Sequence, residues 1–369
     1  MKYQRSAILV LITILLVCVV TPLFAQGERE SEAFHETRTA VDALGRTVTI
    51  SGEINRVMVV GRAAVMPADA LYLFPAAMEM EVLLAKTDQG LGDFFDLIRP
   101  DSEHDYRLGQ QVGAEEILAH KPDLVLTKAN NYDSIVKLLE PFSVPMFVMD
   151  LEDADSWKQE IVQLGILLND TETPQRIIAG FEMRERLVDA QIADLPEEQR
   201  PRVLIMQAAA ADGVTAFSVS PRNWIQSKLT QRAGGNPVWL EDSPDSNAWR
   251  KVSFEQIAAW QPEKIIIISY KSSAEPFLQT IRTHAQWQNL DAVKNGSVVA
   301  APADVLNYFQ SDSRWILALQ WLAAELHPDR FPDFSMEQEI RSFYREFYGI
   351  AEHTIQQLIS LYRASVGIH

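Results

Sequence analysis

A long amphipathic helix, predicted over residues 173–196, divides the chain into two parts of similar length. Thr173 and Pro174 are typical of a helix start, because Pro tolerates the first helical position and Thr caps free amides. Apolar residues then recur every three or four positions, as in a helix with one buried face. At 1.5 Å per residue the helix is about 33 Å long, the diameter of a small domain. The pattern alone is that of any surface helix, but its central position predicts a connection between two domains.

Strand-like runs alternate with helical patterns on both sides of this helix. The strand-like runs are 56–60, 81–86, 123–127 and 145–149 in the first half, and 202–207, 215–220, 264–269 and 297–301 in the second. This alternation is typical of a parallel sheet covered by helices on both faces. A small hairpin is predicted at 39–50, and three closing helices at 312–326, 335–348 and 352–365.

The first 25 residues have the features of a secretory signal peptide. Lys2 and Arg5 form the positive start, an apolar run follows, and cleavage is expected after Ala25. Cys18, the only cysteine, is an alternative site, for lipidation. We therefore expect an exported, periplasmic protein, or a membrane-tethered one if Cys18 is lipidated.

Bulk composition limits the partners and the chemistry. The 369 residues leave room for two domains, and a hydrophobic content of 47% provides a core for each. The net charge of -17 argues against nucleic acid as a partner. Residues 26–38 are polar, acidic and poor in core residues, which predicts a flexible tether. Because the chain has no cysteine after the signal segment, disulfides and thiolate catalysis are excluded.

A short block occurs once in each half. Residues 115–126, EEILAHKPDLVL, match residues 255–266, EQIAAWQPEKII, with Glu, Ile, Ala and Pro at identical offsets. In both blocks a short helix ends at a proline, Pro122 or Pro262, and leads into a buried strand. The match predicts two halves related by duplication, although any helix, turn and strand unit shares some of these features.

Motifs of catalysis were not found in the chain. It has no Gly-rich phosphate loop, no Gly-x-Ser-x-Gly elbow and no His-Glu-x-x-His helix. Its seven histidines are scattered, whereas a metal site needs several converging ligands. His104, between Glu103 and Asp105, is the best candidate, and a solvated loop is the simpler interpretation. We expect no resident metal ion and no cofactor.

Aromatic and basic residues gather at the predicted ends of strands, where open α/β sheets bind ligands. These candidate ligand-binding residues are Arg62, Lys128, Tyr132, Trp224, Trp249, Arg250, Tyr270, Lys271 and Tyr308. Aromatic faces suit a ringed organic ligand, and cations suit an anionic one. A pocket between two domains would collect all of these loops. We expect Trp287, Trp315 and Trp321 to lie in the core. Trp239 could lie either in the core or in the ligand pocket.

Taken in order, several blocks make the chain resemble the type III solute-binding proteins of ABC importers, which include binders of cobalamin, haem and ferric siderophores. The blocks are DALGRTV at 42–48, the repeat at 115–126, the long helix, GGN at 234–236, WRKVSFE at 249–255 and VKNGSV at 293–298. The resemblance implies an α/β fold with two Rossmann-like lobes, residues 39–170 and 197–369, bridged by a single long α-helix at 171–196. The ligand would lie in the cleft between the lobes.

The resemblance also implies a non-catalytic monomer that docks onto an ABC permease dimer. In this family, acidic residues on the two lobes contact arginines of the permease. The match places them at Glu115 and Glu255, with Glu116 as an alternative to Glu115. Carboxylates at equivalent points of two lobes suit a symmetric dimer, although the helix dipole alone also favours glutamates at helix starts. Trp249 corresponds to a cleft tryptophan of the cobalamin binder, which makes it the strongest ligand-binding candidate.

The identity of the ligand is less constrained. Gln110 stands where the cobalamin binder has an aromatic residue, and no His and Tyr arrangement for haem iron is visible. The basic residues at loop ends favour an anionic iron chelate of the siderophore type, with haem or cobalamin as alternatives. Two hypotheses of other classes are an exported two-lobe metal-dependent enzyme and a receptor for a bare metal ion.

Overall fold

The computed structural model describes residues 37–86, 89–100, 105–109, 111–211, 214–241, 246 and 248–368. The predicted signal peptide with Cys18, and also His104 and Gln110, lie outside these residues. From Thr37 onward the chain forms one compact unit. Its first strand, β1 (Thr37–Val41), pairs antiparallel with β2 (Thr47–Ser51). Thr37 and Arg38 therefore belong to the predicted hairpin and not to the predicted tether.

Five parallel strands form the sheet of the N-terminal lobe, in the order β5-β4-β3-β6-β7. The strands are β3 (Arg56–Val59), β4 (Glu81–Ala85), β5 (Asp105–Leu108), β6 (Leu124–Lys128) and β7 (Met146–Met149). Every residue of β6 is buried, as expected for a strand covered on both faces. The helices and turns are α2 (Val65–Tyr72), η1 (Pro75–Met78), α3 (Phe94–Ile98), α4 (Ala114–His120), η2 (Ala129–Asn131), η3 (Tyr132–Val136), α5 (Lys137–Leu139), η4 (Glu140–Phe142) and α6 (Ala154–Leu167).

The C-terminal lobe has a mixed sheet in the order β11-β9-β8-β12-β13, with β10 beside the start of β8. Its strands are β8 (Arg202–Ala211), β9 (Val214–Val219), β10 (Asn236–Pro237), β11 (Arg250–Val252), β12 (Lys264–Ile268) and β13 (Val298–Ala300). β9 runs antiparallel to β8, because the connection between them is too short for a parallel crossover. The parallel sheet expected from the alternation is therefore mixed in this lobe, where the β8–β9 and β9–β11 pairs are antiparallel. The helices and turns are η5 (Glu197–Gln199), α8 (Ile225–Arg232), α9 (Phe254–Trp260), α10 (Glu275–Thr283), η6 (Trp287–Asn289) and α11 (Asp291–Lys294).

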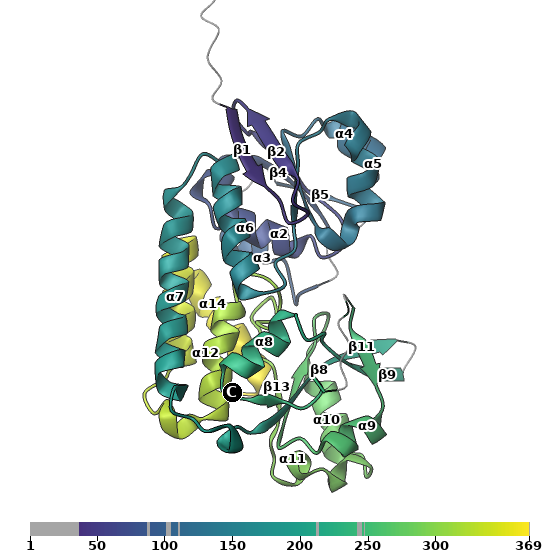
Figure 1. Cartoon of the computed structure of the whole chain (residues 1–369), viewed down its shortest axis with the longest axis vertical. Helices are drawn as coiled ribbons and strands as arrows, with labels where there is room; N and C mark the ends of the chain where they lie inside the picture. Colours follow the sequence, from purple (N-terminus) through teal and green to yellow (C-terminus); the bar gives the residue numbers. More distant parts are fainter. Residues whose placement is uncertain are drawn as a thin grey trace, which may run out of the picture. The chain divides into compact units, whose positions relative to one another are not determined.

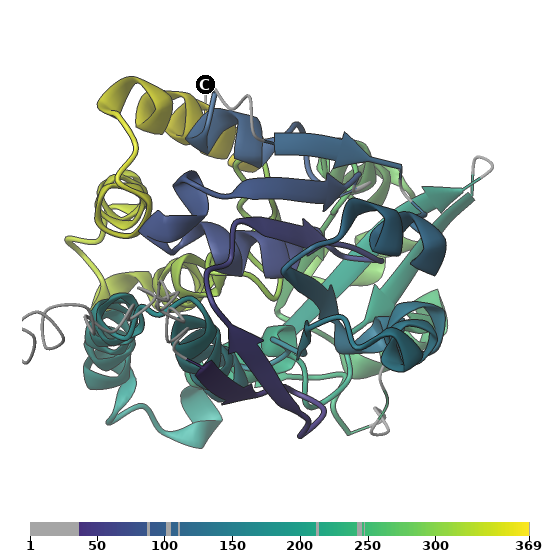
Figure 2. The same ribbon diagram turned by 90° about the horizontal axis from the view of Figure 1, so that it is seen from above.

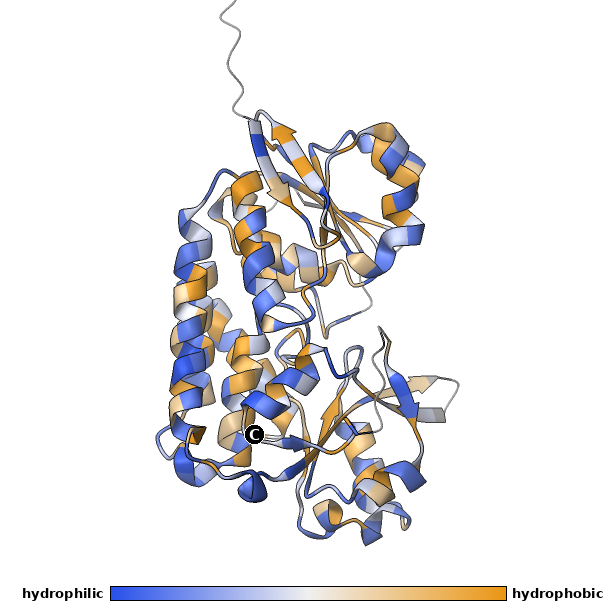
Figure 3. Ribbon diagram, in the orientation of Figure 1, coloured by the Kyte–Doolittle hydropathy of each residue, from blue (hydrophilic) through white to orange (hydrophobic). Residues whose placement is uncertain are grey.

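The predicted connecting helix is α7 (Glu172–Ile192), which runs beside both lobes in Figure 1. Its start differs from the prediction, because Thr173 lies inside the first turn and Asp170 supplies the cap. The Asp170 Oδ1 atom accepts the backbone N–H of Glu172 at 3.2 Å and of Thr173 at 2.9 Å. Figure 3 shows hydrophilic and apolar residues interleaved along α7, as expected for a helix with one buried face. Among the described helices, none has both the length and the apolar character needed to cross a bilayer.

Three helices close the chain, as predicted. They are α12 (Trp315–Leu326), α13 (Met336–Phe343) and α14 (Glu352–Val366), with turns η7 (Pro328–Arg330) and η8 (Tyr344–Tyr348) between them. Figures 1 and 2 place them on the same side of the molecule as α7, and α12 packs against α7. Phe181 of α7 packs against an aromatic residue of each lobe. Its ring centroid lies 4.7 Å from that of Trp157 in α6 and 5.3 Å from that of Trp315 in α12. Trp287, Trp315 and Trp321 are buried, as expected. Trp239, for which the sequence left the core and the cleft open, is buried as well.

A buried carboxylate in the middle of α7 has partners from both lobes. Glu185 accepts a hydrogen bond from Lys158 Nζ of α6 at 2.9 Å and forms an ion pair with Arg232 of α8. Arg232 also contacts Asp189, one turn further along α7, at 2.8 Å. The connecting helix is thus anchored to a helix of each lobe.

A second junction between the lobes is buried and polar. Arg314, directly before α12, lies with its Nη1 atom 2.9 Å from the Asp69 Oδ1 atom of α2. The Asp69 carboxylate also accepts the Ser313 backbone N–H at 2.8 Å and the Tyr348 hydroxyl at 2.6 Å. The Arg314 guanidinium lies 3.9 Å from the ring centroid of Phe94, at a distance typical of a cation–π contact.

The repeated block has a defined setting in the N-terminal lobe. Arg56 Nη1 donates to the carbonyl oxygen of His120, the last residue of α4, at 2.8 Å. The Asp123 carboxylate accepts the Arg56 backbone N–H at 2.8 Å. Lys121, between them, has a φ of 49°, which turns the chain from α4 toward β6.

The second copy of the block is held by equivalent contacts. Arg202 Nη2 donates to the carbonyl oxygen of Trp260, the last residue of α9, at 2.5 Å. The Glu263 carboxylate accepts the Arg202 backbone N–H at 2.8 Å, and Gln261 has a φ of 43°. The sequence repeat therefore corresponds to the same local structure in both lobes.

Candidate ligand-binding cleft

A cavity of about 690 Å³ lies between the two lobes. It is lined by loops that follow β3, β4, β6 and β7 in one lobe and β12 in the other. Open α/β sheets bind ligands at these carboxyl ends of strands. Six of the predicted ligand-binding residues line it: Arg62, Lys128, Trp224, Trp249, Tyr270 and Lys271.

Two predicted residues, Tyr132 and Arg250, do not line the cavity. Tyr132 begins the π-helical turn η3, and its side chain is 41% exposed. Arg250 is the first residue of β11. The Arg250 guanidinium lies 5.7 Å from the ring centroid of Trp260, the last residue of α9.

Tyr308 does not line the cavity either, because its loop folds back into the core. An antiparallel bridge joins Ala303 to Asn307, and the Tyr308 N–H donates to the Pro302 carbonyl oxygen at 3.0 Å. The Tyr308 ring is fully buried and stacks on Tyr362, with 6.5 Å between ring centroids. The prediction that Tyr308 faces the ligand is corrected by this packing.

Arg62 is positioned by a loop clamped to the end of β6. Gly61 has a φ of +96°, and a Cβ atom there would lie 2.6 Å from Asn131 Cγ, so glycine is required. Asn131 Oδ1 accepts the Arg62 N–H at 2.9 Å, and Asn131 Nδ2 donates to the Arg62 carbonyl oxygen at 3.1 Å. Asn131 Nδ2 also contacts the Thr127 hydroxyl at 3.1 Å. The backbone of Arg62 is therefore fixed while its side chain is exposed.

Three aromatic side chains form the wall of the C-terminal lobe. Trp224 and Trp249 meet edge to face at 5.7 Å between centroids, and Trp249 and Tyr270 lie 6.1 Å apart. The Tyr270 hydroxyl donates to the Phe309 carbonyl oxygen at 2.9 Å, and Gln226 Nε2 donates to the same oxygen at 2.9 Å. Burial raises the pKa of Tyr270 well above its ordinary value, so this residue presents a neutral phenol.

The cavity has a buried end, which we define by Lys128, Glu152, Ser311 and Gln226. Lys128 is 2% exposed, and its ammonium group forms an ion pair with Glu152. The other Glu152 oxygen accepts the Ser311 hydroxyl of the opposite lobe at 2.7 Å. The Lys128 and Glu152 charges offset each other, and Glu152 joins the two lobes at this point.

Glu152 depends on a strained turn that is supported from α6. Leu151, directly before it, has a φ of 60°, which is uncommon for a residue with a Cβ atom. The Glu160 carboxylate of α6 accepts the backbone N–H groups of Asp150 at 2.9 Å and Leu151 at 3.2 Å. Burial raises the pKa of Glu160 to about 8, although these two hydrogen bonds act in the opposite direction.

The open end of the cavity carries positive charge. We define it by Arg62, Lys86 and Lys271, all of which are exposed. Within the described part of the chain, the side chains of Arg62 and Lys86 have no ion-pair partner. Cations at the rim of a cleft attract anionic ligands and raise their local concentration. The cleft is thus suited to an organic ligand with an anionic part.

Five residues of this site were missed by sequence reasoning. Glu152, Asn131 and Lys86 follow β7, β6 and β4, so the rule that located Lys128 could also have located them. Ser311 and Gln226 are polar residues beside apolar helical patterns, and the sequence has no feature that marks them. Their positions depend on how the two lobes pack.

The two predicted docking glutamates lie at helix starts on different lobes. Glu115 is in the first turn of α4 and Glu255 in the first turn of α9, and both are exposed. Ser253 and Gln256 form a capping box at α9. Hydrogen bonds from its own backbone amide and from Ser253 lower the pKa of Glu255, which keeps it ionised. Glu116 is exposed as well.

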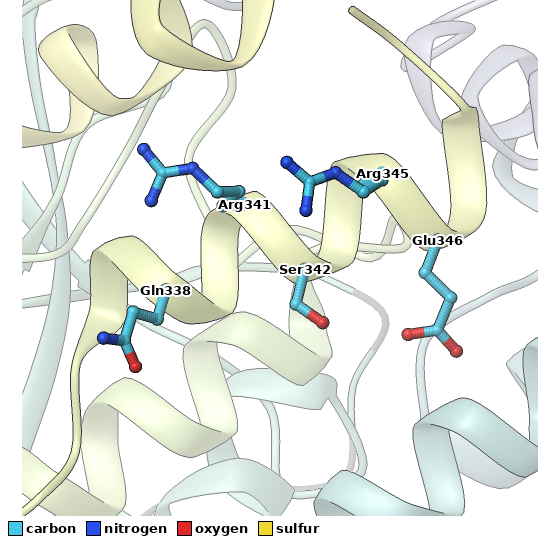
Figure 4. Close-up of a pocket in the computed structure, with 5 residues that line it drawn as sticks. All are labelled: Gln338, Arg341, Ser342, Arg345 and Glu346. Carbon is cyan, nitrogen blue, oxygen red and sulfur yellow. The ribbon is translucent and has the colours of Figure 1, made fainter. Parts of the chain in front are cut away.

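A second pocket, of about 310 Å³, lies along α13 and η8 and is drawn in Figure 4. Its cations are already paired, because Arg341 and Arg345 each lie 2.8 Å from a Glu352 oxygen. Hydrogen bonds from Gln356 and Arg341 lower the pKa of Glu352 to about 2. The charge of these arginines is therefore offset within the protein. Among the described residues, no group of three or more His, Cys, Asp or Glu is arranged to hold a metal ion.

Comparisons with known proteins agree with this geometry. The family model for periplasmic binding proteins matches residues 82–305. The molybdate-binding protein MolA of Haemophilus influenzae is 23% identical over 84% of this chain and 91% of its own length. The Fe(3+)-citrate-binding protein YfmC of Bacillus subtilis is 22% identical over 84% of this chain and 93% of its own.

Among solved structures, a periplasmic solute-binding protein from Veillonella parvula has the same fold. Its TM-score is 0.67 at 21% identity, and the match covers 89% of this chain and 99% of that one. The shared architecture is two α/β lobes with a cleft between them and one long helix beside both. The chain belongs to the family of periplasmic binding proteins, in the class of ABC solute-binding proteins whose lobes are joined by a single helix.

Proposed function

We propose that this solute-binding protein captures an iron chelate of the siderophore type outside the cytoplasm and delivers it to an ABC import permease. The observation that carries the proposal is a cleft with an aromatic wall and a cationic open end. Trp224 and Trp249 offer ring faces and edges to an organic ligand, and Arg62 and Lys86 attract its anionic groups. The protein acts as a non-catalytic monomer, and its lobes stay joined by α7 throughout.

The size of the cavity supports a chelate over a bare ion. Cavities that hold drug-sized organic ligands have volumes of roughly 300–1,000 Å³, and this one measures about 690 Å³. A tetrahedral oxyanion such as molybdate would leave most of that space empty. The Fe(3+)-citrate-binding relative supports an anionic ferric complex as the ligand class.

Haem and cobalamin are the alternatives within the same fold. Both would use the aromatic wall, but neither needs three cations at the open end. A metal-dependent enzyme and a receptor for a bare metal ion would both require converging metal ligands. The described residues of the cleft instead supply one carboxylate, which is paired with Lys128. The chemistry of the lining therefore favours binding of a preformed complex.

Delivery would involve Glu115 and Glu255, which are exposed on different lobes. Matching contacts of Arg56 and Arg202 hold their helices to the first sheet strand of each lobe. Two carboxylates at equivalent points of two similar lobes are complementary to the two arginine-bearing subunits of a permease dimer. Export would be directed by residues 1–25, with tethering to the membrane if Cys18 is lipidated.

The ligand class is tested by quenching of tryptophan fluorescence with a panel of ferric citrate, a ferric hydroxamate, haem and cobalamin. Trp224 and Trp249 line the cleft and report on its occupancy. We expect a ferric chelate to bind most tightly, and Arg62→Gln to weaken it on the order of tenfold, because a charged hydrogen bond is lost. Arg186→Gln, on the exposed face of α7, is the matched control. Binding of haem or cobalamin alone, or of no compound in the panel, would contradict the proposal.

A further inference from the structure

The buried end of the cleft contains a negative charge in a cavity whose other charged groups are cations. Glu152 pairs with Lys128, which is buried and would otherwise be an uncompensated ammonium group. Its second oxygen accepts the Ser311 hydroxyl of the opposite lobe at 2.7 Å. A ligand that reaches this end therefore contacts a carboxylate that already binds Lys128 and Ser311 of the protein.

A second acceptor lies at the same end. Gln226 is 3% exposed, and its Nε2 atom donates to Phe309 and Tyr270. Its Oε1 atom is buried and has no hydrogen-bond partner among the described residues. A buried acceptor without a partner is unfavourable, and Gln226 lines the cavity, so a ligand donor would satisfy it.

The two acceptors belong to one neighbourhood. Tyr270 receives a hydrogen bond from Gln226 at 3.2 Å. Burial is the main cause of the raised pKa of Tyr270, and the negative charge of Glu152 adds to it. Glu152, Tyr270 and Gln226 all line the cavity. The buried end therefore offers acceptors, whereas the open end offers the cations Arg62 and Lys86.

On the basis of the proposed function, we infer that Glu152 determines the specificity of the cleft. With Gln226 it accepts hydrogen bonds from a hydroxyl or amine end of the ligand, and by offsetting the charge of Lys128 it leaves anionic groups no free cation at the buried end. The anionic part of the ligand then lies toward Arg62 and Lys86. Discrimination of this kind disfavours the wrong ligand as well as attracting the right one. Small oxyanions, which have no donor end, are the ligands that Glu152 rejects.

Sodium molybdate is a suitable probe, because it is a small dianion without hydrogen-bond donors. Isothermal titration calorimetry on the mature protein is expected to show on the order of tenfold tighter molybdate binding by Glu152→Gln than by the unmodified protein. Glutamine retains an acceptor for Ser311, so this variant removes the charge and leaves the contact between the lobes. Glu198→Gln is the matched control, since Glu198 is exposed and lies outside the cleft.

Two further variants complete a double-mutant cycle on Lys128 and Glu152. Lys128→Gln leaves Glu152 unpaired and is expected to bind molybdate more weakly than the unmodified protein. Lys128→Gln/Glu152→Gln removes both charges and is expected to return to the unmodified affinity. If Glu152→Gln does not fold, as judged by thermal unfolding, the comparison of Lys128→Gln with the double variant measures the effect of the Glu152 charge without an unpaired lysine.

The outcomes separate this inference from the proposed function. Equal molybdate affinity of the unmodified protein and Glu152→Gln, or no difference between Lys128→Gln and the double variant, overturns the role of Glu152. Failure of the unmodified protein to bind any ferric chelate overturns the proposed function, whatever the molybdate results. A protein that binds a ferric chelate, and gains molybdate affinity only when Glu152 loses its charge, supports both.

Discussion

Arg314 and Asp69 come from different lobes, yet their side chains are both fully buried and lie 2.9 Å apart. Asp304 and Asp312 flank the same guanidinium, each at 3.4 Å. The Tyr344 hydroxyl donates to Asp304 and so extends the network. Movement of the lobes at this junction would expose or separate these charges. The protein therefore has a fixed junction near α2 and α12 in addition to the connecting helix.

Arg314→Met is expected to lower the free energy of unfolding by about 3–5 kcal/mol, because it leaves buried carboxylates without their cation. Urea unfolding followed by circular dichroism measures the loss. Arg186→Met is the control, because the Arg186 side chain is 67% exposed and its loss should change stability by no more than about 0.5 kcal/mol. Similar stabilities of the two variants would show that the junction contributes little.

Gly180→Ala is expected to destabilise the protein by about 1–3 kcal/mol, the usual cost of overpacking. Gly180 is closely packed, because a Cβ atom there would lie 2.7 Å from Phe347 Cζ and 2.5 Å from Glu346 Oε1. Gly113→Ala is the control, since a Cβ atom there would meet nothing within 4 Å. Thermal unfolding decides between this cost and the gain in helix propensity, and a higher melting temperature for Gly180→Ala would contradict the expectation.

The buried Glu160 carboxyl is expected to make stability depend on pH. Burial raises its pKa from 4.5 to about 8 in the folded protein, so the folded state holds a proton that the unfolded state has released. Its contribution is complete below about pH 4.5 and is lost as the pH rises through about 8. Glu160→Gln should remove this decline between pH 5 and about 8, as measured by urea unfolding at a series of pH values. Parallel pH profiles for the variant and the unmodified protein would refute it.

Charge reversal at both predicted docking positions, Glu115→Lys/Glu255→Lys, is expected to abolish stimulation of the transporter ATPase. Ligand affinity should be unchanged, because both residues lie outside the cleft. The experiment uses the permease reconstituted with its ATPase subunits, with Glu53→Lys/Glu198→Lys as a control of equal charge on other exposed positions. Glu116→Lys, added separately, decides which residue of the first block acts. Normal stimulation by the double variant would remove both glutamates from the docking surface.

The sequence was sufficient to predict the architecture and much of the cleft, for identifiable reasons. Strand ends converge in a parallel sheet, so Arg62, Tyr270 and Lys271 could be located from the pattern of apolar runs alone. Tyr308 follows a strand too, but a local bridge between Ala303 and Asn307 turns it inward. Patterns of hydrophobicity do not encode such a bridge.

Contacts between the lobes were beyond prediction. Glu152 and Ser311 are 159 positions apart, and Asp69 and Arg314 are 245 apart. Each of these side chains reads in isolation as an ordinary surface residue. Their burial follows from the packing of complete lobes, which no local pattern describes. The cap of α7 was misplaced for a smaller reason: Asp170 competes with Thr173, and both residues are suitable caps.

The equivalent contacts of α4 and α9 affect the surface that this protein presents to a partner. Arg56 and Arg202 fasten each helix to the strand that begins its own lobe's sheet, so neither helix can shift without its lobe. The span between the two helices is consequently set in the interior, where Arg314 meets Asp69. A core substitution at that point would alter the distance between two outer surfaces while leaving every surface residue in place.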